Sequence, residues 1–499
     1  WPVSSAGDIN GDGFDDVIVS AFRNDANGGD SGSSYIVFGR ASGFDAALNL
    51  SSLDGSNGFR LNGAAGDFLG LSVSSVGDIS GDGFDDVSIG SNYTDPKTGQ
   101  TSLVSYTVFG KASGFDAVME SSSITGSNGF RQDGGVISNA GDVNGDGFDD
   151  FTIGSSVVFG KATGFSAELD LSNLDGNNGF SVDGEGLSSA GDVNGDGFGD
   201  LITADTGASP NGIPYAGSSY VIFGKASGFD AMLELSSLDG SNGFRMDGEF
   251  PYGQASGTAA GDINGDGFDD VVIGAVDTST GYNSNANAYL VFGKATGFNA
   301  AVQLGNMDVN TGIRLDNGDR GFLGASFSDA GDIDGDGIDD LIVSAPGERF
   351  PSNGGSSYVI FGSRKVSDII GTPGNDQLQG TPAAEHFKAG AGDDNMIGDG
   401  GADIFEGGDS NDAIWVPDLG FDWIFGDAGN DALHLMGSDL DLNLTKYASK
   451  INSIETIDLS GIGDNTLTLT VSDVLNLSDS NTLIVDGDAG DRVIGLSKD

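Results

Sequence analysis

The apolar residues of this chain fall in short runs that alternate with clusters of Gly, Asp, Asn and Ser. Short runs rich in β-branched residues are typical of strands, and the intervening clusters are typical of turns. One stretch predicts strands over residues 72–76, 87–89 and 106–109, a variable loop over 92–103, and an outer strand at 129–131. The pattern predicts many short strands and almost no long helix. No run reaches the roughly 18 apolar residues of a membrane span, so none is expected.

An acidic motif, D-x-[N/D/S]-x-D-G-x-x-D, lies between the first two strands of this stretch and recurs along the chain. Its six copies begin at Asp8, Asp78, Asp142, Asp192, Asp262 and Asp332, and successive copies are 70, 64, 50, 70 and 70 residues apart. Units of four short strands at such a period suit the blades of a β-propeller, which pack radially and leave few open edges.

The motif has the oxygen-rich composition that calcium prefers, since this ion takes six to eight oxygen ligands. Side chains at positions 1, 3, 5 and 9 and the backbone carbonyl at position 7 can converge on one ion, and glycine at position 6 permits the sharp turn. Position 8 is not counted as a ligand, because it is Gly199 in the fourth copy. The predicted ligands are Asp8, Asn10, Asp12, Phe14, Asp16; Asp78, Ser80, Asp82, Phe84, Asp86; Asp142, Asn144, Asp146, Phe148, Asp150; Asp192, Asn194, Asp196, Phe198, Asp200; Asp262, Asn264, Asp266, Phe268, Asp270; and Asp332, Asp334, Asp336, Ile338, Asp340.

Two other interpretations of these loops are weaker. The motif could be an Asp/Gly turn that binds no metal. Catalytic use of the carboxylates is disfavoured, because the same group appears six times.

Each unit also closes on a Phe-Gly pair, as at Phe38-Gly39 and Phe109-Gly110. This ending and the acidic loop together resemble FG-GAP repeats, which occur in the head of integrin alpha subunits and in many bacterial secreted proteins. The resemblance covers residues 1–365 and implies an all-β propeller, commonly of seven blades. Six loops leave two alternatives open: six blades, or a seventh upstream of Trp1. By analogy with the integrin head, ligands are expected on the longest variable loops, residues 22–33, 92–103, 205–217, 249–258, 277–286 and 347–355.

After Gly362 the period changes to nine residues, with an acidic residue at the sixth position and an apolar residue at the eighth. This pattern is typical of the calcium-binding parallel β-roll of RTX proteins. We therefore expect an RTX-type β-roll over 366–434 and a β-rich cap over 435–499, which resembles the tails of type I secreted proteins. Glu385 replaces aspartate in the second repeat. The predicted calcium ligands of this region are Asp376, Asp394, Asp403, Asp412, Asp422 and Asp431.

Charge and composition exclude several functions. The chain has 20 Lys and Arg against 75 Asp and Glu, a net charge of −55, whereas a nucleic-acid partner requires a cationic surface. The absence of cysteine excludes disulfides, thiolate chemistry and Cys-ligated zinc. Neither H-E-x-x-H nor G-x-S-x-G occurs, so the chain is not expected to be an enzyme.

The sequence therefore predicts a calcium-stabilised extracellular bacterial protein. We expect an adhesin or a structural component of the cell surface or matrix, which folds on calcium after type I secretion. Its expected partners are surface glycans, matrix proteins or copies of itself. The alternative is a carbohydrate-binding or polysaccharide-degrading secreted propeller, in which the loop residues Tyr215, Tyr252 and Tyr282 would stack on sugars.

Overall fold

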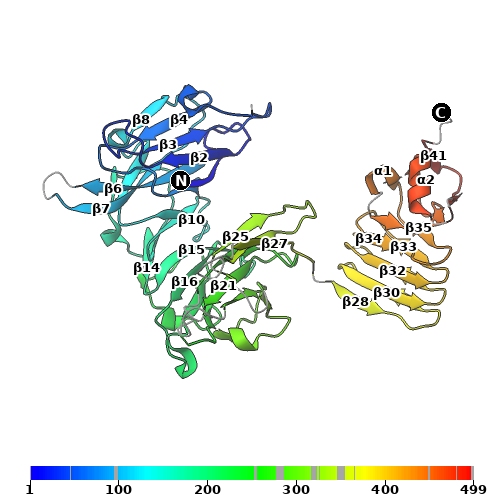
Figure 1. The fold of residues 1–499 in the computed structure, drawn as a ribbon. Coiled ribbons are helices and arrows are strands. Elements are labelled where there is room, and N and C mark those ends of the chain that lie inside the picture. Colours follow the sequence, from blue (N-terminus) through cyan, green and yellow to red (C-terminus); the bar gives the residue numbers. More distant parts are fainter. Residues whose placement is uncertain are drawn as a thin grey trace. The chain divides into compact units, whose positions relative to one another are not determined.

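The chain folds into two compact units, Trp1–Arg364 and Lys365–Asp499 (Figure 1). The computed structural model describes residues 2–44, 46–94, 99–251, 256–276, 286–315, 323–324, 326–345, 355–364, 366–447, 450–478, 480 and 482–495. Strands dominate these ranges, which confirms the expected all-β class. None of the helices in them has the length and apolar character that a membrane crossing requires.

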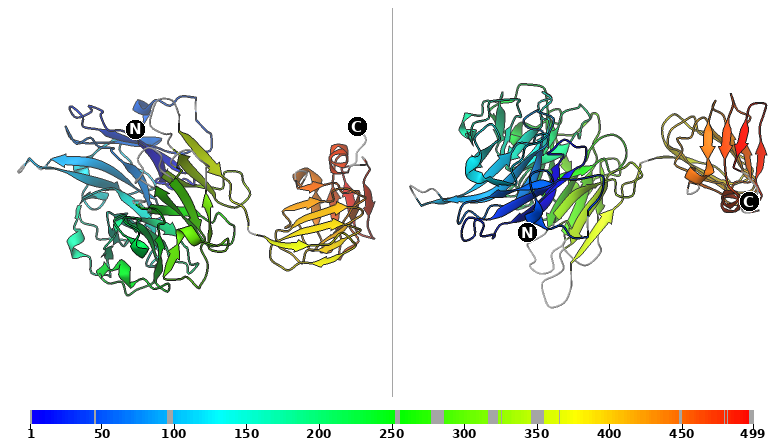
Figure 2. Two further views of the ribbon diagram at one scale, coloured as in Figure 1. Left: turned by 60° about the horizontal axis from the view of Figure 1, so that its bottom comes forward. Right: turned by 90° about the horizontal axis from the view of Figure 1, so that it is seen from above.

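The first unit contains sheets that follow one another in chain order, a succession consistent with a propeller-like fold (Figure 2). Strands within each sheet run antiparallel, apart from a short fifth strand in the first four sheets, which comes from the segment between the third and fourth strands of the next sheet. For example, β8 pairs parallel with β4 through Arg60 and Val118. Each of these short strands therefore joins two successive sheets. The six sheets are β1 (Val3–Gly7), β2 (Asp16–Ala21), β3 (Ser33–Val37), β4 (Gly58–Asn62) and β8 (Val118–Glu120); β5 (Val73–Gly77), β6 (Asp86–Thr94), β7 (Thr101–Val108), β9 (Gly129–Asp133) and β13 (Glu168–Leu169); β10 (Ile137–Gly141), β11 (Asp150–Ile153), β12 (Ser156–Val158), β14 (Gly179–Val182) and β18 (Met232–Leu233); β15 (Glu185–Gly191), β16 (Asp200–Asp205), β17 (Ser218–Ile222), β19 (Gly243–Asp247) and β23 (Ala301–Gln303); β20 (Ser256–Gly261), β21 (Asp270–Val276), β22 (Ala286–Val291) and β24 (Gly312–Leu315); and β25 (Ser326–Gly331), β26 (Asp340–Ala345) and β27 (Ser356–Ile360).

The expected variable loop at residues 92–103 is shorter than the sequence suggests. Strands β6 and β7 continue into it, and Asn92 pairs with Leu103 while Thr94 pairs with Thr101. The polar composition of this segment hid the hairpin, because both of its faces carry polar side chains and no hydrophobic alternation marks it.

Apolar side chains on alternate positions of the strands form the core between successive sheets. Ile18 and Ile36 of the first sheet lie in one buried cluster with Val87 and Ile89 of the second. The closing phenylalanines join the same layers: the Phe38 ring lies 5.4 Å from that of Phe115, between ring centroids. Equivalent clusters fill the other junctions up to the fifth and sixth sheets. The stability of this unit therefore comes largely from burial between sheets.

The repeated packing stops at the two end sheets. Val17 of the first sheet is 43% exposed, whereas its counterpart Val87 in the second sheet is fully buried. On the sixth sheet, Ile342 and Val359 are 37% and 47% exposed. Among the described residues, nothing lies within 4 Å of a side chain added at Gly335, whereas one added at Gly11, Gly81, Gly145 or Gly195 would meet a phenylalanine ring of the next repeat. These described positions on the two end sheets therefore lack the apolar cover that Val87 has at a junction between successive sheets.

The second unit consists of parallel strands in which paired residues are 18 positions apart along the first coils, as in the pairing of Leu378 with Met396. Two nine-residue repeats thus form one coil. The apolar eighth position points inward, so Phe387, Met396, Phe405 and Ile414 are fully buried in one core. The strands are β28 (Ser367–Ile370), β30 (Glu385–Ala391), β32 (Ile404–Asp409), β34 (Trp423–Phe425) and β37 (Ile451–Asn452); β29 (Gln377–Gln379), β31 (Asn395–Ile397), β33 (Ala413–Val416), β35 (Ala432–Leu435), β38 (Thr456–Asp458) and β40 (Ile484–Asp486); and β36 (Asp441–Asn443), β39 (Thr466–Thr468) and β41 (Arg492–Ile494).

Two short helices, α1 (Leu444–Tyr447) and α2 (Val471–Leu477), lie near the C-terminal end of the second unit. Thr470 and Asp473 form a capping box at the start of α2, in which each side chain accepts a backbone N–H of the other residue. Strands β38 and β40 continue the sheet of β35, so parallel pairing extends beyond residue 435.

Candidate cation loops and carboxylate columns

The aspartate at position 1 organises each acidic loop of the first unit. In the sixth loop, the Asp332 carboxylate accepts N–H groups from Gly335 at 2.6 Å, Asp336 at 3.0 Å and Gly337 at 2.8 Å. Gly337 occupies position 6 with a φ of +86°, a conformation that glycine adopts without steric cost. The motif therefore closes the loop by itself, through contacts between residues that are near in sequence.

The aspartate at position 9 begins the second strand of each sheet and is buried in all six loops. Asp340 accepts the N–H of Ile333 at 2.8 Å and that of Gly362 at 2.9 Å. Gly362 belongs to the closing Phe-Gly pair, and the other five pairs donate to their position-9 aspartates in the same way. The glycine of the pair thus anchors a predicted ligand, a role that the sequence did not reveal.

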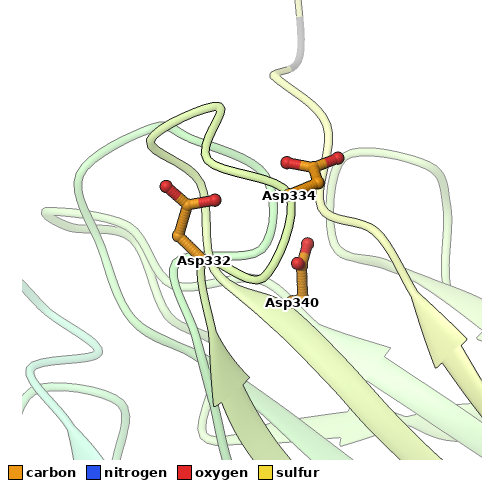
Figure 3. Close-up of side chains that lie close together, drawn as sticks. All are labelled: Asp332, Asp334 and Asp340. Atoms are coloured by element: carbon orange, nitrogen blue, oxygen red, sulfur yellow. The ribbon is translucent and has the colours of Figure 1, made fainter. Parts of the chain in front are cut away.

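The sixth loop brings three predicted ligands together (Figure 3). Oxygens of Asp332, Asp334 and Asp340, at positions 1, 3 and 9, all lie within 4.8 Å of one another. Asp336 at position 5 instead accepts the N–H of Ile338 at 2.9 Å. Three convergent carboxylates, one of them buried, form a group that can hold a divalent cation.

Burial raises the pKa of five position-9 aspartates. It raises the pKa of Asp86, Asp150, Asp200 and Asp270 to about 8 each, and that of Asp16 to about 7. The carboxylates at positions 1 and 5 add to the effect by repulsion, while the glycine N–H opposes it. Each buried carboxylate is therefore costly to ionise unless a cation neutralises it.

The position-3 side chain of the fifth loop carries an independent sign of a ligand. The carboxamide of Asn264 is buried and donates through Nδ2 to Asp270, at 3.1 and 3.2 Å to its two carboxylate oxygens. Its Oδ1 atom has no hydrogen-bond partner among the described residues. A buried carbonyl oxygen without a partner is unfavourable, and a bound cation would satisfy it.

In the second unit, the predicted ligands form a column that runs from coil to coil. The N–H of Asp376 donates to Asp394 at 2.7 Å, that of Asp394 to Asp412 at 2.8 Å, and that of Asp412 to Asp431 at 2.8 Å. The second carboxylate oxygen of Asp394, Asp412 and Asp431 is buried without a hydrogen-bond partner among the described residues. Burial raises the pKa of Asp412 to about 6 and that of Asp431 to about 7.

This column ends on a residue that sequence reasoning missed. The N–H of Asp431 donates to the buried Glu455 carboxylate at 3.0 Å. Glu455 lies outside the nine-residue period, and the only sequence signal for it is an acidic residue directly before a short alternating strand.

A second, shorter column lies beside the sheet that contains β30 and β32. The N–H of Glu385 donates to Asp403 at 2.9 Å, and burial raises the pKa of Asp403 to about 7. Asp422 is the predicted ligand of the next coil on this sheet, but its carboxylate lies 3.6 Å from Lys450 Nζ. That cation gives Asp422 a partner of its own.

Two of the variable loops in the first unit are tied to linkers that follow them in the chain. Asn27 donates to Glu120 at 2.5 Å, and Asn211 donates to Gln303 at 2.5 Å. An open pocket of about 520 Å³ adjoins the hydrogen bond between Asn211 and Gln303. Its lining includes Asn211, Asp247, Glu249, Gln303 and Asn306. Tyr215 is 53% exposed. Tyr252 and Tyr282 lie outside the described residues. The loops at 277–286 and 347–355 lie outside them too, except for the last residue of each.

Comparison with known proteins places this geometry in context. The FG-GAP repeat family matches residues 1–37, 255–288 and 325–360, which confirms three of the expected repeats. Integrin alpha-6 of Gallus gallus is 34% identical over 86 residues, 17% of this chain and 7% of that protein. Integrin alpha-PS5 of Drosophila melanogaster is 31% identical over 206 residues, 40% of this chain and 18% of that protein. The chain thus spans less than a fifth of the length of these curated relatives.

Proposed function

We propose that this chain is a calcium-stabilised extracellular bacterial protein that acts as an adhesin or as a structural component of the cell surface or matrix. Its first unit is a propeller of FG-GAP blades and its second is a calcium-binding parallel β-roll. Calcium neutralises the acidic loops and the carboxylate columns. Because cytosolic calcium is low, the chain is exported unfolded by type I secretion and folds outside the cell.

The observation that carries this proposal is the burial of carboxylates without enough donors. Asp394, Asp412 and Asp431 each keep one buried oxygen without a hydrogen-bond partner among the described residues. In the sixth loop, Asp332, Asp334 and Asp340 converge. A ligand that binds the folded chain and not the unfolded chain stabilises folding by mass action. Extracellular calcium modules bind at roughly 10⁻⁴–10⁻³ M, so such sites stay empty at cytosolic calcium.

Calcium-dependent folding is tested by circular dichroism and thermal unfolding of the full chain. Protein refolded without calcium should show a weaker β signal and a lower melting temperature, and both should be restored when millimolar calcium is added, whereas magnesium should act weakly. An equally heat-stable fold at zero and millimolar calcium would reject the proposal.

The adhesive or structural role is tested separately. The folded chain is immobilised and presented with matrix proteins, surface glycans and free copies of itself, in calcium and in chelator. Calcium-dependent binding to one of these classes supports the proposal. A calcium-folded chain that binds none of them would leave calcium stabilisation standing and remove the adhesive role.

The polar pocket beside Asn211 favours a carbohydrate-binding role as the second candidate. Carboxamides and carboxylates, here Asn211, Gln303, Asp247 and Glu249, are side chains that hydrogen-bond sugar hydroxyls. A glycan array in calcium distinguishes the two. Binding that is lost in Asn211→Ala would favour the carbohydrate role, whereas binding that survives would place the ligand elsewhere.

A further inference from the structure

Position 8 of the acidic motif, which sequence reasoning left without a role, connects each loop to the loop of the preceding unit. The Asp85 carboxylate of the second loop accepts the N–H of Asp8, the first residue of the first loop, at 2.7 Å. In return, the N–H of Asp85 donates to the Asp8 carbonyl at 3.3 Å. The same exchange joins Asp149 to Asp78, Asp269 to Asp192 and Asp339 to Asp262, with carboxylate distances of 2.8, 2.6 and 3.0 Å.

The third junction lacks this carboxylate but keeps the rest of the contact. Gly199 replaces the aspartate, and its N–H still donates to the Asp142 carbonyl at 2.8 Å. The Phe198 ring still covers Gly145, as Phe84 covers Gly11 at the first junction. The backbone N–H of Lys225 also still donates to the Val143 carbonyl at 3.0 Å, as Lys111 does to Ile9. The chain therefore contains a natural control, a junction that differs mainly in the missing side chain.

We propose that the position-8 aspartates are positioning residues that couple calcium binding between neighbouring loops, and that the coupling is interrupted at Gly199. This inference rests on the proposed calcium function. Asp8 supplies a ligand through its carboxylate, and its backbone forms both hydrogen bonds to Asp85. Asp85 in turn lies between Phe84 and Asp86, two predicted ligands of the second loop. An ion that orders Asp8 therefore also holds the second loop in the conformation that binds calcium.

The coupling is reciprocal, because a free energy of interaction between two sites raises both affinities by the same factor. It extends from the first to the third loop and from the fourth to the sixth. The two groups of three loops bind independently of each other.

The experiment measures the calcium midpoint of each loop separately, by hydrogen–deuterium exchange of peptides from the full chain at graded free calcium. The first loop is inactivated by D12N/D16N, in which each carboxamide keeps one acceptor oxygen and loses the negative charge. The calcium midpoint of the peptide over residues 78–86 is expected to rise about fivefold, the lower end of typical coupling between sites. The matched variant D146N/D150N inactivates the third loop, and the midpoint over residues 192–200 is expected to change less than about twofold.

A second pair of variants separates coupling from a merely structural role. In D85A, the calcium midpoint of the peptide over residues 78–86 should be the same with and without D12N/D16N, because the carboxylate that accepts the Asp8 N–H is absent. In D85N, whose carboxamide oxygen can still accept the Asp8 N–H, the dependence should return.

The proposal is overturned if D12N/D16N leaves the second loop unchanged in the otherwise native chain. It is equally overturned if the change persists in D85A. If no loop peptide responds to calcium in the native chain, the proposed calcium function fails as well, so the two failures are distinguishable.

Discussion

The two units arrange the hydrogen bonds of their acidic residues in different ways. In the first unit, each acidic loop is closed by its own residues, as when Asp332 accepts three N–H groups from the five residues that follow it. In the column of the second unit, Asp412 and Asp431 accept the N–H of a residue 18 or 19 positions earlier, so these contacts join one coil to the next. The first arrangement is local, whereas the second is shared between coils.

This difference affects what remains when cations are removed. The first unit keeps an apolar cluster at each of its five junctions between successive sheets. The described part of the second unit has one apolar core, which is accompanied by a column of buried acidic residues from Asp394 to Glu455. Repulsion within the column therefore opposes the packing of every coil, while repulsion in an acidic loop opposes only one end of a sheet.

The largest expected effect is the response of the two units to chelator. Peptides of the second unit over residues 385–435 should lose most of their protection from hydrogen exchange, because the buried column is left without counter-ions. Peptides over residues 200–222 of the first unit should retain partial protection from their apolar interfaces. Equal loss in both units would remove the distinction between local and shared sites.

A core substitution in the first unit should be costly whether or not calcium is present. Phe229→Ala removes a buried ring whose centroid lies 4.6 Å from that of Phe180, and such a loss costs about 3–5 kcal/mol. The matched control is Phe44→Ala, at the same repeat position but 53% exposed at the end of the array, with an expected cost below about 1 kcal/mol. Urea unfolding followed by fluorescence or circular dichroism measures both; a similar cost for the two would contradict the packing described.

A charge-removing substitution in the column should change sign with calcium. Asp412→Asn retains an oxygen that accepts the Asp394 N–H and removes a buried negative charge. Without calcium it should stabilise the second unit by about 1 kcal/mol or more, and with calcium it should destabilise it by about 1–3 kcal/mol through loss of a charged ligand. Thermal unfolding in the two conditions is the measurement. The same sign in both would show that Asp412 does not bind the ion.

A further expected effect is a dependence of the stability of the calcium-free protein on pH. Burial raises the pKa of Asp86, Asp150, Asp200 and Asp270 from about 4 to about 8. The folded state therefore holds more protons than the unfolded state between these values, and stability falls as pH rises through that window. Dialysed, calcium-free protein should melt at a higher temperature at pH 5.5 than at pH 8. Calcium should reduce this difference, because it replaces the protons; a melting temperature that rises with pH would contradict the burial.

Much of the candidate site could be predicted because its information is local. The loop ligands lie within nine residues of one another, and the apolar eighth position of each nonamer marks the core of the second unit, as at Phe405. Features that depend on contacts between units were not visible in the sequence. These include the hydrogen bond from the Asp8 N–H to the Asp85 carboxylate, the hydrogen bond from the Gly362 N–H to Asp340, and the end of the column at Glu455. Each joins residues whose separation is set by variable linkers, so no fixed spacing marks them.

The most direct measurement of the central claim is a calcium anomalous difference map from crystals grown with millimolar calcium. The account predicts peaks enclosed by Asp332, Asp334 and Asp340 and at the equivalent places of the other five loops, with further peaks beside the unpaired oxygens of Asp394, Asp412 and Asp431. A well-resolved map without a peak at any of these places would contradict it.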